Sequence, residues 1–532
     1  PWLRPDGNNI IAVKVDNSDQ PNSRWYSGCG IYRHVWVESA AAVSVGHWGT
    51  YIVPVLKGNG TAQFKVVASI ENTTGKAVKA IVRNTLLDAE GRRVASSQSA
   101  MKLAAKGDNT QTLSLRKPRL WSVEHPYIYT MRTEVVVDGC VVDTYDTTTG
   151  VRTFKFDSKK GFSLNGKSMK INGVCQHHDL GCLGAALSED ALHRQLTMLR
   201  DMGCNAVRCS HNPPSPELLN MCDTMGIIVM DESFDMWRKK KTQNDYARFF
   251  DEWHERDLTD LIVRDRNHPS ILMWSIGNEV LEQWNQADAD TLTLEQANRI
   301  LNFGHDMTEQ AKESGMNINS LLTKRLADIV RSLDPTRPIT AGCNEPEPSN
   351  NLFRSKALDI IGFNYHRQWI KDVPKNFPDM PFLMTESVSA LQTRGHYTMP
   401  SDSLIAAPLS WDKEYTDPSF RCSAYDNVHV PWGSNHESTW DIVKHTPYCC
   451  GQFIWTGWDY IGEPTPYGFP ARSSYFGIID LAGFPKDSYY MYQSEWTDKP
   501  VLHLFPHWNW LEGQDIDMWC YYNDYDDVEL FV

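Results

Sequence analysis

The stretch Ile271-Leu-Met-Trp-Ser-Ile-Gly-Asn-Glu279 decides how the rest of this chain is organised. It is a short apolar run that follows the turn residues Asn267-His268-Pro269. A run of this length between turn residues predicts a β-strand that is buried on both faces. A carboxylate at the end of such a strand is costly to bury without a partner or a task. In a parallel α/β barrel that end faces the active site, so Glu279 is either a structural ion-pair residue or a catalytic one.

The composition limits the class of protein. The chain has 532 residues, of which 41% are hydrophobic and 22% are charged, as is usual for globular proteins. Its net charge of -14 and the absence of a Lys/Arg-rich stripe argue against a nucleic-acid surface. No apolar run is long enough to span a membrane. The short basic run Lys239-Lys240-Lys241 is predicted to lie in a solvated loop.

The first 150 residues have the pattern of β structure. Asn9–Val15 and Ile31–Val37 alternate between apolar and polar residues, which predicts two strands within residues 1–40, and we expect these residues to be the tail of an all-β domain. Residues 41–150 continue with short alternating runs separated by turn residues. Strands at this spacing predict a β-sandwich of immunoglobulin type.

From about residue 151, strand-like apolar runs alternate with helical stretches, which predicts β/α units. Eight such units are the content of one (β/α)8 TIM barrel, which we expect over residues 151–506. The long segment from Ser387 to Pro447 is predicted to form a functional loop over the barrel mouth. Residues 507–532 return to strand character and predict the start of another β domain. The eight candidate barrel strands are Met169–Val174, Asn205–Ser210, Ile227–Glu232, Ile271–Glu279, Ile339–Cys343, Ile360–Tyr365, Phe382–Glu386 and Gln452–Trp458.

Polar and ionisable residues recur at the C-terminal ends of these predicted strands. Any one of them has an ordinary explanation as a capping or hydrogen-bonded residue. Their recurrence at one end of nearly every strand predicts a functional site at the barrel mouth. The residues are His177, His178, Asp179, Arg208, Ser210, His211, Asn212, Asp231, Glu232, Asn278, Glu279, Asn364, Tyr365, His366, Glu386, Trp455, Trp458 and Asp459.

Three hypotheses from different classes fit this set. The first is a glycosidase, because cleavage of a glycosidic bond needs two carboxyl groups and Glu279 and Glu386 end two strands across the mouth. The second is a metal-dependent hydrolase with an imidazole-rich site. The third is a non-catalytic sugar-binding protein, which leaves the two glutamates without a role. The ligands of the metal hypothesis would be His177, His178, His211, His366 and Asp459.

At these residues the chain resembles glycoside hydrolase family 2, the family of β-galactosidases, β-glucuronidases and β-mannosidases. Val207-Arg-Cys-Ser-His-Asn-Pro213 is similar to the family's strand-two motif, and Trp274-Ser-Ile-Gly-Asn-Glu279 to its acid/base motif. Phe382-Leu-Met-Thr-Glu386 is similar to the nucleophile strand. Trp458–Pro464 and Ser474–Asp480 resemble the β-galactosidase-like branch that is common in gut Bacteroidetes.

The resemblance implies a domain order and an activity. It makes residues 1–40 the C-terminal part of a sugar-binding jelly roll and residues 41–150 an immunoglobulin-like domain. It makes residues 151–506 the catalytic barrel and residues 507–532 the start of a C-terminal β domain. The implied activity is that of a retaining exo-β-glycosidase, foremost a β-galactosidase, with β-glucuronidase or another β-glycosidase of the family as the alternative.

The resemblance also implies roles for single residues. Glu279 would be the acid/base and Glu386 the nucleophile. The remaining implied residues contact the sugar or adjust the nucleophile. Asn278 would bind the sugar 2-hydroxyl. Arg208 would keep Glu386 ionised, and Tyr365 would adjust its basicity. His177, His211 and Asp459 would line the sugar subsite, and the apolar face of the sugar would pack against Trp455.

Two departures from the family pattern affect the cofactor and the sugar. The stretch Ser233-Phe-Asp-Met-Trp237 lacks the Glu and His that help hold magnesium in well-known members, so we expect no required cofactor and no required Mg²⁺. Ser389 stands where those members have a His that helps read galactose. The expected partner is a carbohydrate, namely a β-galactoside of an oligosaccharide or glycan, and the resemblance allows a homo-oligomer. The family branch also implies a periplasmic or secreted location.

Overall fold

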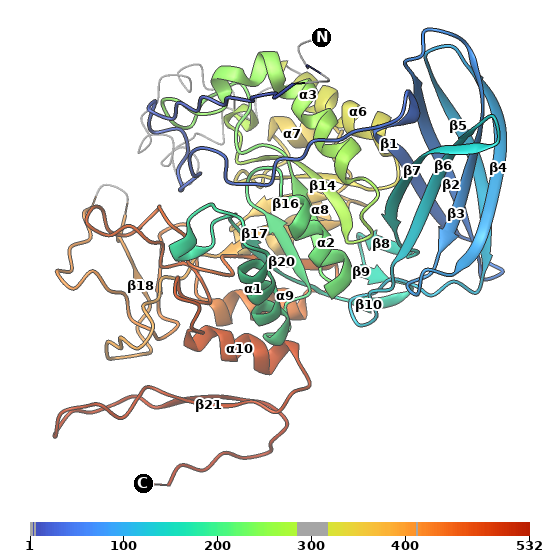
Figure 1. Ribbon diagram of the computed structural model, residues 1–532. Helices are drawn as coiled ribbons and strands as arrows, with labels where there is room; N and C mark the ends of the chain where they lie inside the picture. Colours follow the sequence, from blue (N-terminus) through green and yellow to red (C-terminus); the bar gives the residue numbers. More distant parts are fainter. Residues whose placement is uncertain (1–3, 5–6, 285–317, 411–412, 532) are drawn as a thin grey trace.

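The computed structural model describes residue 4 and residues 7–284, 318–410 and 413–531 of the chain. A β-sandwich lies beside a β/α barrel, and a β-hairpin near the C-terminus lies beyond the barrel on the other side (Figure 1). The segment that precedes the sandwich runs back across the barrel (Figure 1). This placement brings residues from outside the barrel to its mouth.

The sandwich consists of two antiparallel sheets. One has the order β1-β2-β5 and the other β4-β3-β6-β7. Along β2 every second side chain is buried, and Phe64 and Val66 from this sheet pack against Leu86 and Met131 from the other. The period of two therefore supplies one apolar face to each sheet. The strands are β1 (Val43–Leu56), β2 (Thr61–Asn72), β3 (Val78–Leu87), β4 (Arg93–Leu103), β5 (Lys106–Arg116), β6 (Tyr129–Val137) and β7 (Cys140–Thr149).

All eight predicted barrel strands are confirmed, with ends that move by a few residues. They form one parallel sheet in the order β15-β14-β13-β12-β11-β20-β17-β16, and a parallel bridge between Cys343 and Phe363 closes it into a barrel. Their residues are buried on both faces, as the apolar runs predicted. The strands are β11 (Ile171–Gln176), β12 (Ala206–Cys209), β13 (Ile228–Glu232), β14 (Ile271–Asn278), β15 (Ile339–Gly342), β16 (Ile361–Asn364), β17 (Phe382–Val388) and β20 (Cys449–Trp455).

Helices cover the outside of the barrel (Figure 1). Ser188 and Ser215 cap the first two by accepting backbone N–H bonds, and Gly226, with a φ of 74°, ends the second. The helices are α1 (Glu189–Asp201), α2 (Pro216–Met225), α3 (Ala247–Asp265), α6 (Ile318–Leu333), α7 (Asn351–Arg354), α8 (Val373–Asn376), α9 (His436–His445) and α10 (Asp487–Trp496), with the 3-10 turns η1 (Gly181–Leu183), η2 (Leu281–Gln283) and η4 (Arg367–Asp372).

Short strands complete the described chain. They are β8 (Phe154–Asp157), β9 (Gly161–Leu164) and β10 (Lys167–Met169) before the barrel, β18 (Ile405–Ala406) and β19 (Val428–His429) in the long loop, and β21 (Leu502–Phe505) and β22 (Trp519–Tyr522) after it. The strand character predicted after residue 507 is present in β22, which pairs with β21.

The prediction of strands at Asn9–Val15 and Ile31–Val37 is wrong. Across residues 7–40 the structure describes one isolated bridge, between Trp25 and Gly462, and no strand. A strand needs a neighbouring strand for its backbone hydrogen bonds, and neither segment has one among the described residues. Their apolar side chains are exposed, for example Ile10 at 91% and Val37 at 86%.

A buried carboxylate joins the sandwich to the barrel. Asp334, directly after α6, accepts hydrogen bonds from Tyr51 of β1 (2.9 Å) and from the indole of Trp274 in β14 (3.0 Å). Burial opposes its charge, but the Arg337 guanidinium lowers the pKa of Asp334 to about 2. The sandwich, α6 and the strand that carries Glu279 are thus fixed to one ionised side chain.

Candidate active site

Arg208, near the end of β12, is the centre of the polar network at the barrel mouth. Its Nη1 donates to Glu386 Oε1 (2.8 Å), and its Nε and Nη2 donate to Glu232 (2.9 and 2.7 Å). Nη2 also donates to Asn278 Oδ1 (2.9 Å). Burial of this guanidinium disfavours its charge, but Glu232 and Glu386 raise the pKa of Arg208 well above its ordinary value. One fixed cation therefore binds side chains from three other strands.

Both carboxylate oxygens of Glu386 are held. Oε1 accepts from Arg208, and Oε2 accepts from the Tyr365 hydroxyl at 2.7 Å. Burial raises the pKa of Glu386 to about 7, with a further contribution from Glu279, whereas Arg208 and Tyr365 lower it. Burial and the two donors therefore act on this pKa in opposite directions, and the expectation that Arg208 and Tyr365 keep Glu386 ionised stays a prediction.

Glu279 directly follows β14 and is held by different partners. Its Oε1 accepts from Asn364 Nδ2 (2.9 Å), and its Oε2 lies 3.8 Å from Arg24 Nη1. The Asn364 amide is itself oriented, because its Oδ1 accepts from Thr385 at 2.7 Å. Glu279 and Tyr365 both have positive φ (43° and 56°), an uncommon conformation that the surrounding contacts must maintain.

Aromatic rings form one wall of the site. His211 stacks on Trp455 with ring centroids 5.3 Å apart, and its Nε2 lies 3.7 Å from Glu386 Oε1. His177 meets Trp455 edge-on and stacks on Trp25 at 4.6 Å. Burial lowers the pKa of both histidines well below the usual value, which favours the neutral form of both rings. The structure thus gathers the residues that were predicted to line a sugar subsite.

The carboxylate of Asp459 contacts residues of the segment that follows β20. It accepts from Lys486 (2.8 Å), from the backbone N–H of Gly477 (2.8 Å) and from Ser474 (3.2 Å). These bonds fold the 474–486 segment against the barrel. A direct contact of Asp459 with substrate stays a prediction.

The metal-centre hypothesis finds no support in the geometry. His178 contacts the carbonyl oxygen of Ser27 (3.2 Å), and His366 contacts that of Asn344 (2.8 Å). Within the ranges that the structure describes, no three His, Cys, Asp or Glu side chains are grouped as metal ligands.

Four residues of the site were missed at the sequence level. Arg24 and Trp25 come from outside the barrel, and Asp235 and Lys241 follow β13. The prediction of a solvated loop at Lys239–Lys241 is wrong for Lys241, which is fully buried and donates to Asp235 Oδ1 and to the Asn278 carbonyl (both 2.7 Å). Asp235 Oδ1 also accepts from Asn278 Nδ2 (2.9 Å) and Arg24 Nη2 (3.1 Å). Asp235, an acidic residue shortly after a predicted strand, was the feature of the sequence that could have indicated this part of the site.

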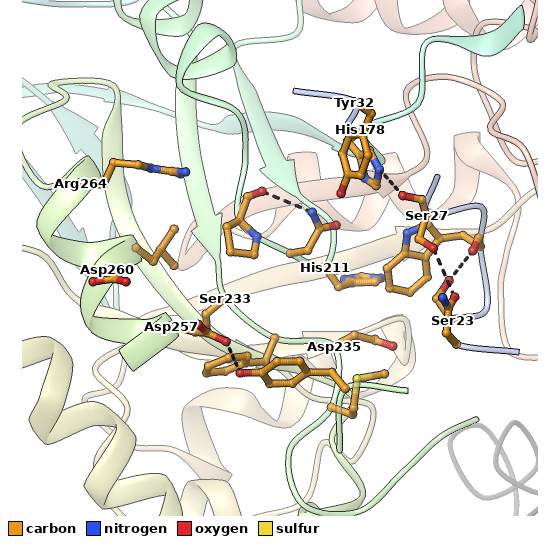
Figure 2. Close-up of a pocket in the computed structure, with 18 of the residues that line it drawn as sticks. Ser23, Ser27, Tyr32, His178, His211, Ser233, Asp235, Asp257, Asp260 and Arg264 are labelled. Carbon is orange, nitrogen blue, oxygen red and sulfur yellow. Dashed lines mark hydrogen bonds between the residues drawn. The ribbon is translucent and has the colours of Figure 1, made fainter. Parts of the chain in front are cut away.

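A cavity of about 400 Å³ adjoins this network. Figure 2 shows His211 and Asp235 on its border with the site, Ser23 and Ser27 on one side, and the α3 residues Asp257, Asp260 and Arg264 on the opposite side. The cavity therefore lies between the segment that carries Arg24, the loops after β12 and β13, and α3.

Gly342, at the end of β15, allows this network to close. A Cβ at this position would lie 2.6 Å from Arg208 Nη2 and 3.1 Å from the Oδ1 atoms of Asn278 and Asn364. We expect Gly342→Ala to displace the guanidinium and to lower kcat by about 100-fold, since misplacement of about 1 Å has effects of this order. The measurement is steady-state kinetics together with the melting temperature. The control is Gly58→Ala, where a Cβ meets nothing within 4 Å, and equal kinetics of the two variants would refute the idea.

Comparison with known families gives two matches. Residues 157–463 match the model of the glycosyl hydrolases family 2 TIM barrel domain, and residues 48–152 match a second glycosyl hydrolases family 2 model. The first match alone covers more than half of the chain.

Similar proteins are also known individually. The chain is 59% identical to a β-galactosidase, BoGH2A, of Bacteroides ovatus, over 100% of this chain and 63% of that protein. It is 24% identical to a β-glucuronidase of Bacteroides fragilis, over 98% of this chain and 71% of the relative. A crystal structure of a β-glycosidase from Bacteroides vulgatus matches with a TM-score of 0.77 and 34% identity, over 96% of this chain and 62% of that one.

Proposed function

We propose that this chain, which belongs to glycoside hydrolase family 2, is a retaining exo-β-glycosidase that removes terminal β-linked galactose. The proposal rests on one observation, namely that two carboxyl groups at the barrel mouth have different hydrogen-bond partners. Glu386 is bound by Arg208 and Tyr365, whereas Glu279 is bound by the neutral amide of Asn364, with the Arg24 guanidinium 3.8 Å away. The alternative is a β-glucuronidase or another β-glycosidase of the family.

In the first step Glu386 attacks the anomeric carbon, and Glu279 donates its proton to the departing glycosidic oxygen. Arg208 and Tyr365 aim the two oxygens of Glu386, so the attacking atom need not reorganise. The covalent glycosyl ester removes the charge of Glu386. Glu279 then accepts a proton from a water molecule, whose oxygen attacks the anomeric carbon as the bond to Glu386 breaks, and the sugar leaves with its original β-configuration.

The neighbouring residues would bind the sugar around these two groups. Asn278 is fixed by Arg208 and Asp235, and it would donate to the 2-hydroxyl, a contact that strengthens in the transition state. The neutral rings of His177, His211 and Trp455 offer an apolar face and imidazole nitrogens to the sugar.

A panel of p-nitrophenyl β-glycosides tests the proposal. We expect the highest kcat/KM with the β-galactoside and no hydrolysis of p-nitrophenyl α-galactoside. A protein of verified fold that cleaves no β-glycoside of the panel would refute the glycosidase, and a preference for the β-glucuronide would favour the alternative.

The pH profile gives a further prediction. In the enzyme without substrate, the pKa of Glu386 is raised to about 7. Because the nucleophile must be ionised, kcat/KM should fall as the pH decreases below about 7. Tyr365 lowers this pKa, so Tyr365→Phe should move the acid limb to higher pH as well as reduce the rate. An acid limb that stays in place in this variant would contradict the role of the tyrosine.

Removal of divalent metal ions gives another testable prediction. We propose that turnover needs no divalent ion, since Ser233–Trp237 lacks the Glu and the His that help hold the metal in the magnesium-dependent enzymes. EDTA treatment followed by gel filtration should leave kcat unchanged. A large loss that Mg²⁺ restores would contradict this, and a loss that only Zn²⁺ restores would revive the metal-hydrolase hypothesis.

The location and assembly are proposals as well. In the parts of the chain that the structure covers, no helix has the length and apolar character to cross a bilayer. On the resemblance to the Bacteroidetes branch, we propose a periplasmic or secreted enzyme that forms a homo-oligomer. Fractionation of the source cells and light scattering of the purified protein test the two statements.

A further inference from the structure

We propose that the charges at the barrel mouth select an uncharged terminal sugar and reject a uronic acid, and that Arg24 and Glu463 set this selectivity. The inference deepens the proposed glycosidase function and rests on it. It separates the galactosidase from the glucuronidase alternative by residues that lie outside the two catalytic motifs.

The backbone fixes Arg24 in the mouth. Trp25 forms an antiparallel bridge with Gly462, and Tyr26 N–H donates to the Ile461 carbonyl at 3.1 Å. The short segment around Arg24 is therefore pinned to the loop after β20. Its side chain is only 11% exposed and reaches both Asp235 (3.1 Å) and Glu279 (3.8 Å).

Arg24 is surrounded by carboxylates. Burial disfavours its charge, but Asp235, Glu463 and Glu279 together raise the pKa of Arg24 above its ordinary value. Glu463 belongs to the loop that pins this segment, has a positive φ of 41°, and accepts from the Tyr460 hydroxyl at 2.7 Å. Burial raises the pKa of Glu463, and Arg24 opposes that change. The antiparallel bridge between Trp25 and Gly462 thus brings two opposite charges to neighbouring positions of the two segments.

The other cations of this network are already bound. Arg208 is bound to Glu232 and Glu386, and Lys241 is bound to Asp235. Together with Arg24 they face a larger number of carboxylates, including Glu279 and Glu463. Among the described residues the carboxylates of this network outnumber these three cations, so a uronate would add a further negative charge to it, and like charges repel strongly in a partly buried site.

An uncharged sugar meets better partners here. Four polar atoms in this region are buried and have no hydrogen-bond partner among the described residues. Hydroxyl groups can both donate and accept, so they can satisfy donors and acceptors without adding charge. The atoms are Arg24 Nε, Trp25 Nε1, His177 Nε2 and Asp235 Oδ2.

The test compares three substrates that share one stereochemistry: p-nitrophenyl β-D-galactopyranoside, the corresponding β-D-galacturonide, and the methyl ester of that galacturonide. The ester keeps the added bulk at C6 and removes the charge. We expect kcat/KM for the galactoside to exceed that for the galacturonide by at least about 100-fold, and the ester to recover at least about tenfold of the difference.

Two variants should change the selectivity in opposite directions. Glu463→Gln removes a negative charge but keeps an acceptor for Tyr460, so the galactoside/galacturonide ratio of kcat/KM should fall about tenfold. Arg24→Gln removes the cation, so the same ratio should rise. The charge-matched control is Glu90→Gln in the sandwich, where the carboxylate is 51% exposed. The ratio is independent of the active fraction, so partial misfolding of a variant does not affect it.

The outcomes are distinct. Equal cleavage of galactoside and galacturonide by the wild-type chain would overturn the inference but leave the glycosidase function in place. An unchanged ratio in Glu463→Gln, or a lower ratio in Arg24→Gln, would also overturn it. Absence of turnover on every β-glycoside would instead overturn the proposed function on which the inference depends.

Discussion

Replacement of Glu386 by Ala should lower kcat for aryl β-galactosides roughly 10⁴–10⁶-fold, the scale seen when an enzyme loses its nucleophile. Both oxygens of Glu386 are aimed by fixed donors, Arg208 at 2.8 Å and Tyr365 at 2.7 Å. A water molecule that fills the space of the missing Glu386 side chain cannot form the covalent glycosyl ester. The loss should be equally large with activated leaving groups, because they do not replace an attacking atom. The measurement is the initial rate of p-nitrophenol release.

The fold should survive this change, which keeps the result interpretable. Arg208 retains Glu232, with bonds of 2.9 and 2.7 Å, so the guanidinium does not become an unpaired buried charge. A melting temperature within a few degrees of the wild type would support this. A mechanism-based 2-fluoro-galactosyl fluoride should label the wild-type protein at Glu386, and mass spectrometry of the peptides identifies the site. A label on another residue would remove Glu386 from the nucleophile's role.

The barrel could be predicted from the sequence because its signal is local. Each strand is a short apolar run between turn residues, and runs such as Ile271–Asn278 are buried on both faces in the structure. A strand of this kind is recognised without knowledge of its neighbours. Asn9–Val15 shows the limit, because its alternating pattern predicts a strand only where another strand pairs with it.

The ends of the strands predicted most of the site for the same reason. Arg208, Glu279, Tyr365 and Glu386 lie at the C-terminal ends of parallel strands, and closure of the barrel brings them together. Arg24 could not be predicted in this way. Its place depends on the pairing of Trp25 with Gly462, a contact between segments far apart in the chain.

The burial of Lys241 was missed for a related reason. In the sequence it belongs to a run of three lysines, which usually indicates a solvated face. In the structure it turns inward because Asp235 and the Asn278 carbonyl offer two acceptors at 2.7 Å. Asp235 lies six residues before Lys241 in the same loop, but the Asn278 carbonyl belongs to the end of β14, and the charge pattern along the chain does not show that the loop turns the lysine toward both.

Replacement of Glu279 by Ala should affect the two chemical steps differently. The acid is needed to protonate a poor leaving group, so the rate of cleavage of a natural β-galactoside should fall by about 10²–10⁴-fold. A substrate with a good leaving group, such as the 2,4-dinitrophenyl β-galactoside, needs no protonation. Its first step should remain fast and yield a burst of phenolate. The second step should be slow, because no general base is present to activate water.

Azide separates this explanation from a simple loss of structure. The space left by the Glu279 side chain, beside Asn364 and 3.8 Å from Arg24 in the wild type, can admit a small anion. Azide needs no general base, so it should restore turnover of the activated substrate. The product should be the β-galactosyl azide, because a second inversion at the anomeric carbon restores the original configuration. The Asn364→Ala variant keeps Glu279 and is the control in which azide should give no such rescue. An α-configured azide, or an α-configured first sugar product from the wild type by NMR, would exclude the retaining assignment.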